Sequence, residues 1–556
     1  MNIRLLFTLL FFALSINRVF AQSTPVSLRS DISIQKVLNI HDGVTRMAKD
    51  PVTGNLFYAT MGGDIYEVFQ PTGLQAYDSL VADSNLHLVT YVQGLTFHDS
   101  VMYVSGNTTS ATPLTRGVIA RGVLQPNGSR VWSEVAHSDA YETADYFDHL
   151  FSGSIVNETG DSLYICSGSR GDHGEIQTRY GLYTNIRNKS LTSCILRIPL
   201  NANAMVIPDD SAALDAQQLI LCRGIRNTYD FRYDGHHHLF GVENSGDRDM
   251  DDEMNWIQAG RHYGFPWQMG STWNPQQYPG FVPANDPLIN HTSTSWQQNF
   301  FSNDPTFPQL PVGFQLTLPC KNYGPDGDAF RDTVTGAILD ASDLDTAIYS
   351  FTAHRSPLGL VFDTDSIFDP PYRGHGFVTC YTRGDTSISG YSTLLSPFND
   401  IGEDILDLDM VYDSSLQNFS FHASRIASGF HHPVDQEIDS NIIYLAEVGF
   451  GNSPAIWAIE MPALTLNSGS FHGITASVYP NPGNSECHVR YQESFNGKVT
   501  LQLFDLNGRQ VIQLNQIQKG NEIVFSVKDL PNGIYFGKLT SGNFAGDFKV
   551  VVVGNQ

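Results

Sequence analysis

Short apolar stretches separated by polar turns recur six times between residues 40 and 460. In each copy, an apolar stretch is followed by a turn rich in Asp, Asn or Gly and by a second stretch that ends in an aromatic or apolar pair. A single hairpin cannot bury its apolar face alone, whereas hairpins repeated around an axis share one core. The pattern predicts an all-β fold whose main part is a six-bladed β-propeller, with an array of β-sandwiches as the alternative. The copies start at Met47, Gly94, Gly153, Tyr229, Leu358 and Pro433.

The composition agrees with many short strands and turns. The chain has 48 glycines, 12% aromatic residues and only 16% charged residues, which does not favour long solvated helices. The spacing of the six copies is irregular, so long loops are expected, notably over residues 265–340. Long loops in a compact domain are usually functional or disordered.

A second domain is expected over residues 474–556. The two prolines of Tyr479-Pro480-Asn481-Pro482 interrupt any preceding element. Alternating stretches follow, and Asn507-Gly508 lies between two of them, at residues 499–504 and 510–512. An Asn-Gly pair in this position is a strong signal for a tight hairpin turn. The pattern predicts a small C-terminal β-sandwich.

Residues 1–21 have the pattern of a secretory signal peptide. Arg4 precedes an apolar run over residues 5–16, and Val19-Phe20-Ala21 places small residues at the expected cleavage position. The run is too short to span a membrane, and no later stretch is long and apolar enough to form a transmembrane segment. We therefore expect residues 22–465 to form the propeller of a secreted protein, exported through the periplasm to the cell surface or the extracellular space.

Charge and cysteine content narrow the possible partners. A formal net charge of −25 gives a surface that repels nucleic acid, so no nucleic-acid partner is expected. Export permits disulfides, but none of the six cysteines shows Cys-x-x-Cys spacing, and the sequence predicts no pairing. Three adjacent histidines, His236 to His238, follow Asp234-Gly235 and most simply form a hairpin tip.

The segment from Gly224 to Pro266 carries the richest set of polar side chains. Arg226 offers a planar fork of donors for an anionic or quinone oxygen, and Asn227 beside it can donate and accept. Acids follow, and their hard oxygens suit Ca²⁺, although a solvated turn capped by Asp residues would give the same pattern. Earlier in the chain, Asp148-His149 places a carboxylate next to an imidazole, the natural general base near neutral pH. The acids are Asp247, Asp249, Asp251, Asp252 and Glu253.

These segments together resemble the soluble quinoprotein glucose/sorbosone dehydrogenase family over residues 40–460. The family fold is a six-bladed propeller, and its members oxidise a sugar hydroxyl and pass the hydride to pyrroloquinoline quinone (PQQ) in the presence of Ca²⁺. The resemblance is carried by Gln93-Gly94-Leu95, Asp148-His149, Gly224-x-Arg226-Asn227, Asp252-Glu253-x-Asn255, Gly260-x-x-Tyr263-Gly264-Phe265-Pro266, Ser356-Pro357-Leu358-Gly359-Leu360 and Pro433-Val434-Asp435.

The resemblance implies catalytic roles for three residues and a substrate contact for a fourth. His149 would be the catalytic base, with Asp148 as its orienting partner. Arg226 would stabilise charge that develops on the quinone. Gln93 would contact the sugar substrate. The natural electron acceptor stays unknown.

The resemblance also implies how the cofactor is held. Arg226 and Asn227 would contact the quinone oxygens of PQQ. The backbone carbonyls of Ser245 and Gly246, next to Asp247, would hold the Ca²⁺ ion.

Two departures from the family pattern concern the negatively charged groups of PQQ. Thr382, followed by Arg383, stands where the glucose enzymes have a lysine, and Phe430-His431-His432-Pro433 stands where they place arginines. Arg383 and His432 are the remaining candidates for these contacts. His432 would bind a carboxylate only when protonated, so the loss of fixed positive charge should weaken PQQ binding.

The C-terminal domain resembles the sorting domain of type IX secretion cargo. The resemblance implies an address that the type IX secretion machinery recognises, and an ordinary carbohydrate-binding sandwich is the alternative. It is carried by Tyr479-Pro480-Asn481-Pro482, Leu503-Phe504-Asp505-Leu506-Asn507-Gly508-Arg509, Leu530-Pro531-Asn532-Gly533-Ile534-Tyr535 and Phe548-Lys549-Val550-Val551.

Three functions are compatible with these residues. The first is a PQQ- and Ca²⁺-dependent sugar dehydrogenase, favoured by His149, Arg226 and Asn227. The second is a surface propeller without catalysis that binds carbohydrate or protein, favoured by Thr382 and His432. The third, a calcium-dependent lactonase propeller, leaves the match between Gly224 and Pro266 unexplained.

Overall fold

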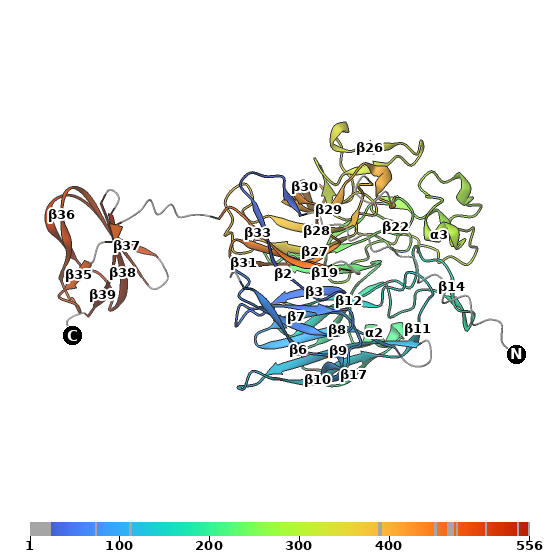
Figure 1. The fold of residues 1–556 in the computed structure, drawn as a ribbon, viewed down its shortest axis with the longest axis horizontal. Coiled ribbons are helices and arrows are strands. Elements are labelled where there is room, and N and C mark those ends of the chain that lie inside the picture. The colour runs from blue at the N-terminus through green and yellow to red at the C-terminus, as the bar shows by residue number, and fades with distance from the viewer. Residues whose placement is uncertain are drawn as a thin grey trace. The chain divides into compact units, whose positions relative to one another are not determined.

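The computed structural model describes residues 24–72, 75–109, 114–386, 392–449, 453–463, 472–473, 476–505, 509–541 and 544–553. The predicted signal peptide at residues 1–21 lies outside the described residues. The chain divides into two compact units, Met1–Ala463 and Leu464–Gln556, both drawn in Figure 1.

Within the described residues, the first unit is built around six antiparallel sheets, the blades of a propeller. Blade 1 contains β3 (Val44–Lys49), β4 (Leu56–Thr60), β5 (Ile65–Phe69) and β6 (Tyr77–Ala82). Blade 2 contains β7 (Tyr91–His98), β8 (Val101–Thr109), β9 (Leu114–Leu124) and β10 (Arg130–Ser138), with β11 (Tyr141–Glu142) on β9 and β17 (Met205–Ile207) parallel to β10. Blade 3 contains β12 (Phe151–Val156), β13 (Ser162–Ser167), β16 (Cys194–Pro199) and β18 (Ile220–Arg223).

The remaining blades follow the same order. Blade 4 contains β19 (Thr228–Tyr233), β20 (Leu239–Glu243) and β21 (Glu253–Trp256). Blade 5 contains β27 (Pro357–Phe362), β28 (Gly376–Arg383), β29 (Gly402–Asp413) and β30 (Asn418–Ser428), with β1 (Val26–Ser27) and β24 (Lys321–Asn322) on β30. Blade 6 contains β31 (Pro433–Asp439), β32 (Ile442–Glu447), β33 (Ala455–Glu460) and β2 (Ser33–Asn39).

The blades close into a ring. The innermost strands β3, β7, β12, β19, β27 and β31 contact one another in this order, and β31 contacts β3. In blade 6, β2 from the beginning of the unit pairs with β33 from its end, with Ile34 opposite Ile459. One blade therefore combines both ends of the unit, which fastens the ring. Each repeat copy in the sequence corresponds to an innermost strand and its neighbour, so the prediction of six blades is confirmed.

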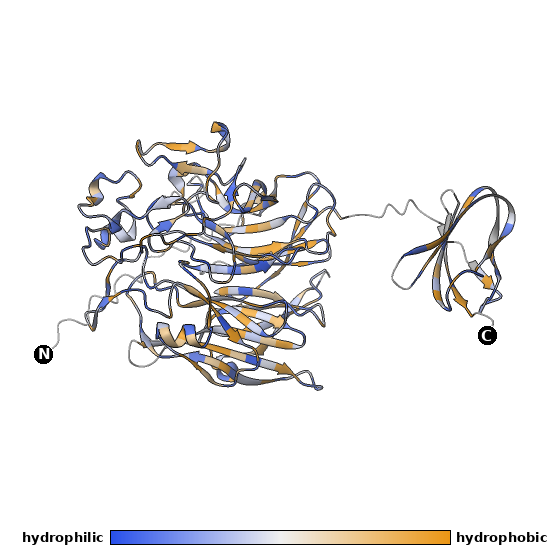
Figure 2. Ribbon diagram, turned by 180° about the vertical axis from the view of Figure 1, so that it is seen from behind, coloured by the Kyte–Doolittle hydropathy of each residue, from blue (hydrophilic) through white to orange (hydrophobic). Residues whose placement is uncertain are grey.

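The apolar core lies between neighbouring blades. Six buried clusters each combine residues of at least two adjacent blades. Phe57 packs with Met102 between blades 1 and 2, and Tyr58 with Tyr444 between blades 1 and 6. Hydrophobic and hydrophilic positions alternate along many of the blade strands in Figure 2. Because burial of one large apolar side chain stabilises by about 1.5–3 kcal/mol, these clusters hold the ring together.

Long connections carry short elements of their own. They include the hairpins β14 (Gln177–Arg179) with β15 (Tyr183–Ile186), β22 (Gln268–Met269) with β23 (Thr272–Trp273), and β25 (Ala329–Arg331) with β26 (Ile338–Asp340). The helices are α1 (Ser84–His87), α2 (Ser211–Ala216) and α3 (Thr294–Gln297), with 3₁₀ turns η1 (Pro275–Gln277), η2 (Pro283–Asn285), η3 (Ser342–Leu344) and η4 (Ser396–Phe398). Residues 265–340 form the long connection expected from the sequence.

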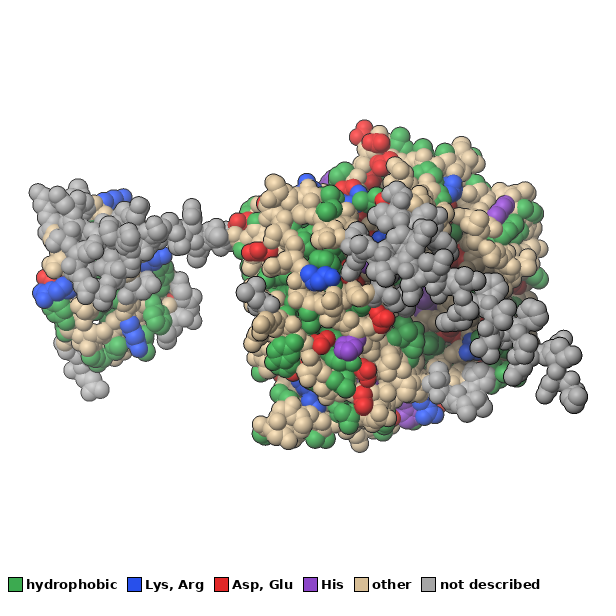
Figure 3. Space-filling model, in the orientation of Figure 1, with side chains coloured by type: hydrophobic (Ala, Val, Ile, Leu, Met, Phe, Trp, Pro, Cys, Tyr) green, Lys and Arg blue, Asp and Glu red, His purple; other side chains and the backbone are tan. Residues whose placement is uncertain are grey.

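Acidic side chains are spread over the face of the propeller unit seen in Figure 3, in keeping with the net charge of −25. Among the described helices, none is long and apolar enough to cross a membrane.

The second unit is a single β structure around its own core. Strands β36 and β37 are long and pair along most of their length, and buried residues such as Val499, Leu501 and Phe525 fill the interior. Its predicted turn residues Asn507-Gly508 lie outside the described residues. The strands are β34 (His472–Gly473), β35 (Ala476–Tyr479), β36 (Glu486–Phe504), β37 (Gln510–Ser526), β38 (Gly533–Ser541) and β39 (Phe544–Val552), in the order β34-β39-β38-β36-β35 with β37 on β36.

Candidate functional site

The candidate residues lie where the innermost strands of the propeller begin. His149 comes two residues before β12, Arg226 and Asn227 directly precede β19, and His432 directly precedes β31. Gln93 is the third residue of β7. Because the blades repeat one order of strands around the ring, these strands begin at the same end of the propeller. The topology therefore brings this set to one end of the propeller.

The His149 imidazole is held in one tautomer by Ser169. Its Nδ1 lies 3.1 Å from the Ser169 carbonyl oxygen and 3.1 Å from Ser169 Oγ. The carbonyl can only accept, and Oγ donates its proton to the Gly171 carbonyl, so Nδ1 carries the proton. Nε2 has no hydrogen-bond partner in the part of the chain that the structure describes. Burial and the charge of Arg226 lower the pKa of His149 to about 3, so the ring is neutral near pH 7.

Gly168 and Ser169 join this imidazole to Arg226. A Cβ on Gly168 would lie 2.4 Å from His149 Cβ and 3.3 Å from the Arg226 carbonyl oxygen, so only glycine leaves room for both. The Ser169 N–H donates to the Arg226 carbonyl at 2.7 Å, and the Ser169 carbonyl accepts from the His149 N–H at 3.0 Å. The His149 imidazole and Arg226 therefore share one rigid support.

Asp148 does not orient His149, and this prediction is corrected. Asp148 Oδ2 accepts a backbone N–H at 2.8 Å and lies 3.8 Å from Arg170 Nε. Phe147 and Leu150, which flank the pair, have φ of 56° and 59°. This left-handed backbone on both sides directs the adjacent side chains to different partners. Burial, opposed by the charge of Arg170, raises the pKa of Asp148 to about 6.

The carboxylate beside Arg226 is Asp172, which the sequence reasoning missed. Arg226 Nη2 lies 3.1 Å from Asp172 Oδ1, and Arg226 Nε donates to the Asp172 carbonyl at 2.8 Å. The Asp247 N–H donates to both oxygens of the same carboxylate, at 2.9 and 3.1 Å. Burial raises the pKa of Asp172, but the hydrogen bond from His173 and the charge of Arg226 hold it well below its usual range. The signal was the glycine-rich stretch at residues 168–175, in which an Asp-His pair is enclosed by glycines.

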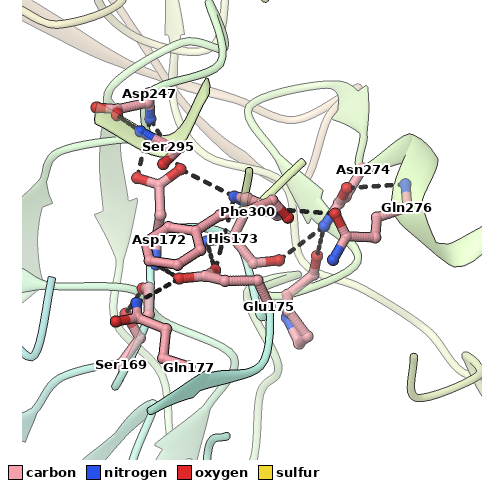
Figure 4. A network of polar contacts seen from close by, with 12 residues as sticks. Ser169, Asp172, His173, Glu175, Gln177, Asp247, Asn274, Gln276, Ser295 and Phe300 are labelled. Carbon is pink, nitrogen blue, oxygen red and sulfur yellow. Dashed lines mark hydrogen bonds and ion pairs between the residues drawn. The ribbon is translucent and has the colours of Figure 1, made fainter. Parts of the chain in front are cut away.

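His173 is a buried imidazolium (Figure 4). Its Nδ1 lies 2.9 Å from Asp172 Oδ2, and its Nε2 lies 3.0 Å from Gln276 Oε1 and 3.3 Å from the Phe300 carbonyl oxygen. The carboxylate and the carbonyl can only accept, so both ring nitrogens carry protons. Burial lowers the pKa of His173, but the charge of Glu175 and the hydrogen bond to Asp172 raise it to about 9. This ring ties the loop that contains Phe300 to the candidate site.

Glu243 fixes the backbone of Arg226 and Asn227 from behind. Its Oε2 accepts from both N–H groups, at 2.7 and 2.9 Å. Glu253 lies opposite Glu243 in the β20–β21 pair, and Asn255 Nδ2 donates to both carboxyl groups at 3.0 and 2.9 Å. Burial raises the pKa of both glutamates, and the charge of Glu243 raises the pKa of Glu253 further.

The turn at Ser245 and Gly246 offers oxygens to a hard cation. None of the described residues donates a hydrogen bond to either carbonyl oxygen. A Cβ on Gly246 would lie 2.8 Å from Asp172 Oδ1, so the carboxylate packs against this turn. Two carbonyl oxygens beside a carboxylate fit Ca²⁺. The Asp247 side chain has another partner, because its Oδ2 accepts the Ser295 N–H at 2.7 Å.

The other acids of the predicted calcium segment do not converge on one point. Each accepts from separate donors of its own, and within the described residues no cluster of three metal-ligating side chains includes them. Of the two interpretations left open, acids that hold turns are therefore favoured over a calcium loop. The contacts are Asp249 to Arg331 and His354, Asp251 to the Tyr349 N–H, Asp252 to Ser245 and Glu253 to the Gly270 N–H.

Gln93 has an open acceptor. Its Oε1 is buried and has no hydrogen-bond partner among the described residues, while Arg46 Nε donates to its backbone carbonyl at 2.7 Å. A buried acceptor without a partner is uncommon in folded proteins. The Gln93 side chain would have to rotate for this oxygen to accept from a ligand hydroxyl.

Arg383 and His432 do not supply free positive charge. Arg383 Nε forms an ion pair with Glu403 Oε2. His432 stacks on Tyr381 with ring centroids 4.7 Å apart, and burial lowers its pKa, so it is neutral near pH 7. Neither residue, nor Thr382 beside them, offers the fixed charge that an anionic cofactor needs at this end of the site.

Comparison with known proteins matches two family models. Residues 95–304 match the glucose/sorbosone dehydrogenase model, and residues 477–553 match the secretion system C-terminal sorting domain model. Both resemblances predicted from the sequence are confirmed over these residues. No curated protein matches the chain.

The solved structures that the chain resembles are distant in sequence. The soluble aldose sugar dehydrogenase from Escherichia coli in its apo form is 12% identical, with a TM-score of 0.47, over 77% of this chain and 99% of that chain. A glucose dehydrogenase is 11% identical, with a TM-score of 0.46, over 77% of this chain and 99% of that chain.

Proposed function

We propose that the chain, which carries a glucose/sorbosone dehydrogenase domain at residues 95–304 and a secretion sorting domain at residues 477–553, is an exported sugar dehydrogenase. It oxidises an aldose-type hydroxyl group by hydride transfer to PQQ in the presence of Ca²⁺. One observation supports this most directly. His149 is a neutral imidazole whose Nε2 has no partner among the described residues and whose support, Ser169, also holds Arg226.

The quinone and calcium end of the site fits the cofactor. Arg226 uses three of its five N–H donors on Asp172 and Asn244, which leaves one on each Nη for a quinone oxygen. Asn227 lies beside it, and the carbonyls of Ser245 and Gly246 are available to Ca²⁺. When bound, PQQ supplies the two-electron acceptor for a hydride.

The residues of the chain move the proton. His149 takes the hydroxyl proton on Nε2 as the C–H bond breaks, a carbonyl forms on the sugar carbon, and the hydride leaves for the acceptor. The Nδ1–H stays bonded to the Ser169 carbonyl, so the ring keeps its orientation. The negative charge of Asp172 favours the imidazolium that forms, and the charge of Arg226 favours return of the proton to solvent. Gln93 Oε1 accepts a second hydroxyl of the sugar.

The sorting domain indicates that the protein is secreted or carried to the cell surface. We propose that residues 1–21 direct the first export step and that the type IX machinery recognises residues 474–556. A dehydrogenase in this location needs an electron acceptor outside the cytoplasm.

The purified chain tests this proposal. With PQQ, Ca²⁺, a panel of aldoses and an artificial acceptor dye, His149→Ala should lower turnover by about 10²–10⁴-fold while PQQ binding is kept. Arg226→Ala should weaken PQQ binding as well as turnover, because its guanidinium contacts the cofactor. His87→Ala is the matched control, since His87 is also a buried histidine bonded to a backbone carbonyl, 2.7 Å from the Gly63 oxygen, and should leave turnover unchanged.

The acid limb of the pH profile gives a second test. Because the pKa of His149 is lowered to about 3, protonation of the base should reduce kcat/KM only near that pH and not near 6.5. If the wild type shows no turnover with saturating PQQ and Ca²⁺, the alternative holds, a propeller that binds carbohydrate or protein without catalysis. The ion-paired Arg383 and the neutral His432 favour that alternative.

A further inference from the structure

Three side chains beside the candidate site form a cluster that the proposed reaction does not use. Glu403, His431 and His432 each offer one ligand atom, and these atoms all lie within 4.8 Å of one another. This is the one such cluster of metal-ligating side chains found within the described residues. We propose that Glu403, His431 and His432 bind a divalent transition-metal ion of the zinc, nickel or copper class. The proposal does not depend on sugar oxidation.

The backbone holds the three residues in place. Glu403 is the second residue of β29, and the His432 N–H donates to its Oε1 at 3.0 Å. The His431 N–H donates to Oε1 of the fully buried Glu447 at 2.9 Å. Glu403 and His432 both have positive φ, 42° and 50°, a strained conformation that persists only where the surroundings enforce it. Two strands and one turn therefore fix the positions from which the ligands project.

The ring geometry allows one ion to reach both imidazoles. The rings of His431 and His432 have centroids 4.8 Å apart and lie at 86° to each other. Ligand atoms about 2.0–2.1 Å from a tetrahedral ion lie about 3.4 Å apart. Because the three atoms lie within 4.8 Å of one another, the side chains need to close by about 1.4 Å at most. His431 and His432 are half-buried, and the proposal requires rotation about their side-chain bonds to supply this movement.

The ligand set selects the class of metal. Two imidazoles and one carboxylate suit zinc, nickel and copper, whereas Ca²⁺ and Mg²⁺ prefer oxygen ligands alone. Three protein ligands leave a tetrahedral ion one position for water or an anionic group. Arg383, ion-paired to Glu403 Oε2, competes with the metal for the carboxylate. Removal of that charge should therefore strengthen metal binding.

The hairpin tip at His236 to His238 is the rival site for the same metals. His237 Nδ1 lies 2.6 Å from Glu158 Oε1, and His238 Nδ1 lies 2.9 Å from Asp234 Oδ2. Each of these histidines thus has an acidic partner of its own. The tip provides a control with the same residue type on an exposed turn.

Calorimetric titration of the full chain with Zn²⁺ tests the proposal, after chelator has been removed. The wild type should bind one ion, and His432→Gln and Glu403→Gln should each weaken that binding at least about tenfold. Arg383→Gln should strengthen it, and His236→Ala/His237→Ala should leave it unchanged. Thermal melting without metal shows whether each variant is folded.

Co²⁺ absorption of the wild type gives a readout that needs no variant. Visible bands of a four- or five-coordinate ion with nitrogen ligands support the site, and only the weak spectrum of the hydrated ion overturns it. Zn²⁺ binding that survives in folded His432→Gln and disappears in His236→Ala/His237→Ala also overturns it, because the metal then sits at the hairpin tip.

Discussion

Replacement of His173 by asparagine removes a buried positive charge from the candidate site. His173 is 3% exposed, and its protonated ring bonds Asp172 on one side and the Phe300 carbonyl on the other. Asparagine is neutral at every pH and keeps a donor for Asp172. Because the folded-state pKa of His173 is raised to about 9, its contribution to stability is complete below pH 6.5 and is lost as the pH rises through 9.

The size of the effect follows from the two pKa values. A change from 6.5 in the unfolded chain to about 9 in the folded chain corresponds to about 3 kcal/mol, at about 1.36 kcal/mol per pKa unit. The lowered pKa of Asp172 describes the same pair, so the two effects are not added. The wild type should therefore lose about 3 kcal/mol relative to His173→Asn between pH 6.5 and pH 9.5.

Urea unfolding at a series of pH values measures this loss. All six tryptophans lie between residues 132 and 457, so their fluorescence reports on the propeller and not on the C-terminal unit. The asparagine variant also loses the stacking of the ring on Phe301, but that loss does not depend on pH. The test is therefore the difference in slope between the two proteins, not their stability at one pH.

His291→Asn is the matched control. His291 is exposed and forms no ion pair within the described residues, so its replacement should leave the slope of the wild type unchanged. Parallel curves for the wild type and His173→Asn would show that His173 is not a buried imidazolium. A wild type that gains stability relative to the variant as the pH rises would reverse the sign and refute the assignment.

Further expectations concern the metal turn, the base and the sorting domain. Ca²⁺ should raise the melting temperature, because a ligand at one hundred times its Kd stabilises the folded protein by about 2.7 kcal/mol. Gly246→Ala should abolish this rise, because its Cβ meets the Asp172 carboxylate at 2.8 Å. An equal rise in both proteins argues against calcium at this turn. Gly168→Ala should displace His149 and lower turnover while the Ca²⁺ effect persists, so unchanged kinetics would count against the shared support. Deletion of residues 474–556 should leave tryptophan-monitored unfolding of the propeller unchanged. It should stop delivery of the protein to the surface of a type IX secreting host, as measured by surface labelling. Continued delivery would contradict the sorting role.

The blades were predictable because their signal is local. Alternation of apolar and polar positions with a turn at each end defines a strand pair, and six copies define six blades without knowledge of any contact between them. The same holds for the paired strands β36 and β37 of the second unit. The start of each innermost strand then locates the candidate site, since all six begin at one end of the ring.

The partners within the site were not predictable from adjacency. Asp148 is next to His149 in sequence, yet the imidazole bonds Ser169, twenty residues further along the chain. The positive φ angles of Phe147 and Leu150 decide this, and the sequence shows no glycine or asparagine there to suggest a left-handed backbone. Local order of residues therefore pointed to His149 as the candidate base but did not reveal its support.

For the acidic segment the sequence left two interpretations open, a calcium loop and turns held by Asp side chains, and the structure favours the second for a related reason. Spacing on alternate residues suggests oxygens that converge, but an irregular loop has no regular face, and each carboxylate there satisfies a nearby donor. Asp172, which does meet Arg226, comes from a different connection within blade 3. Contacts between residues of different blades depend on how the ring closes, which local sequence patterns do not show. From the sequence, such a site is predicted only through the resemblance to a family.

Charge is distributed unequally between the two sides of this site. On the side of blades 3 and 4, Arg226 keeps donors to spare because Asp172 is shared with His173 and with the Asp247 N–H. On the side of blades 5 and 6, the charge of Arg383 is satisfied by Glu403. An anionic ligand would therefore find free guanidinium donors at Arg226, whereas the side of blades 5 and 6 would contribute only after a gain of positive charge. A metal ion bound by Glu403 would provide that charge. Glu403 therefore connects the proposed metal site with the proposed binding of an anionic cofactor.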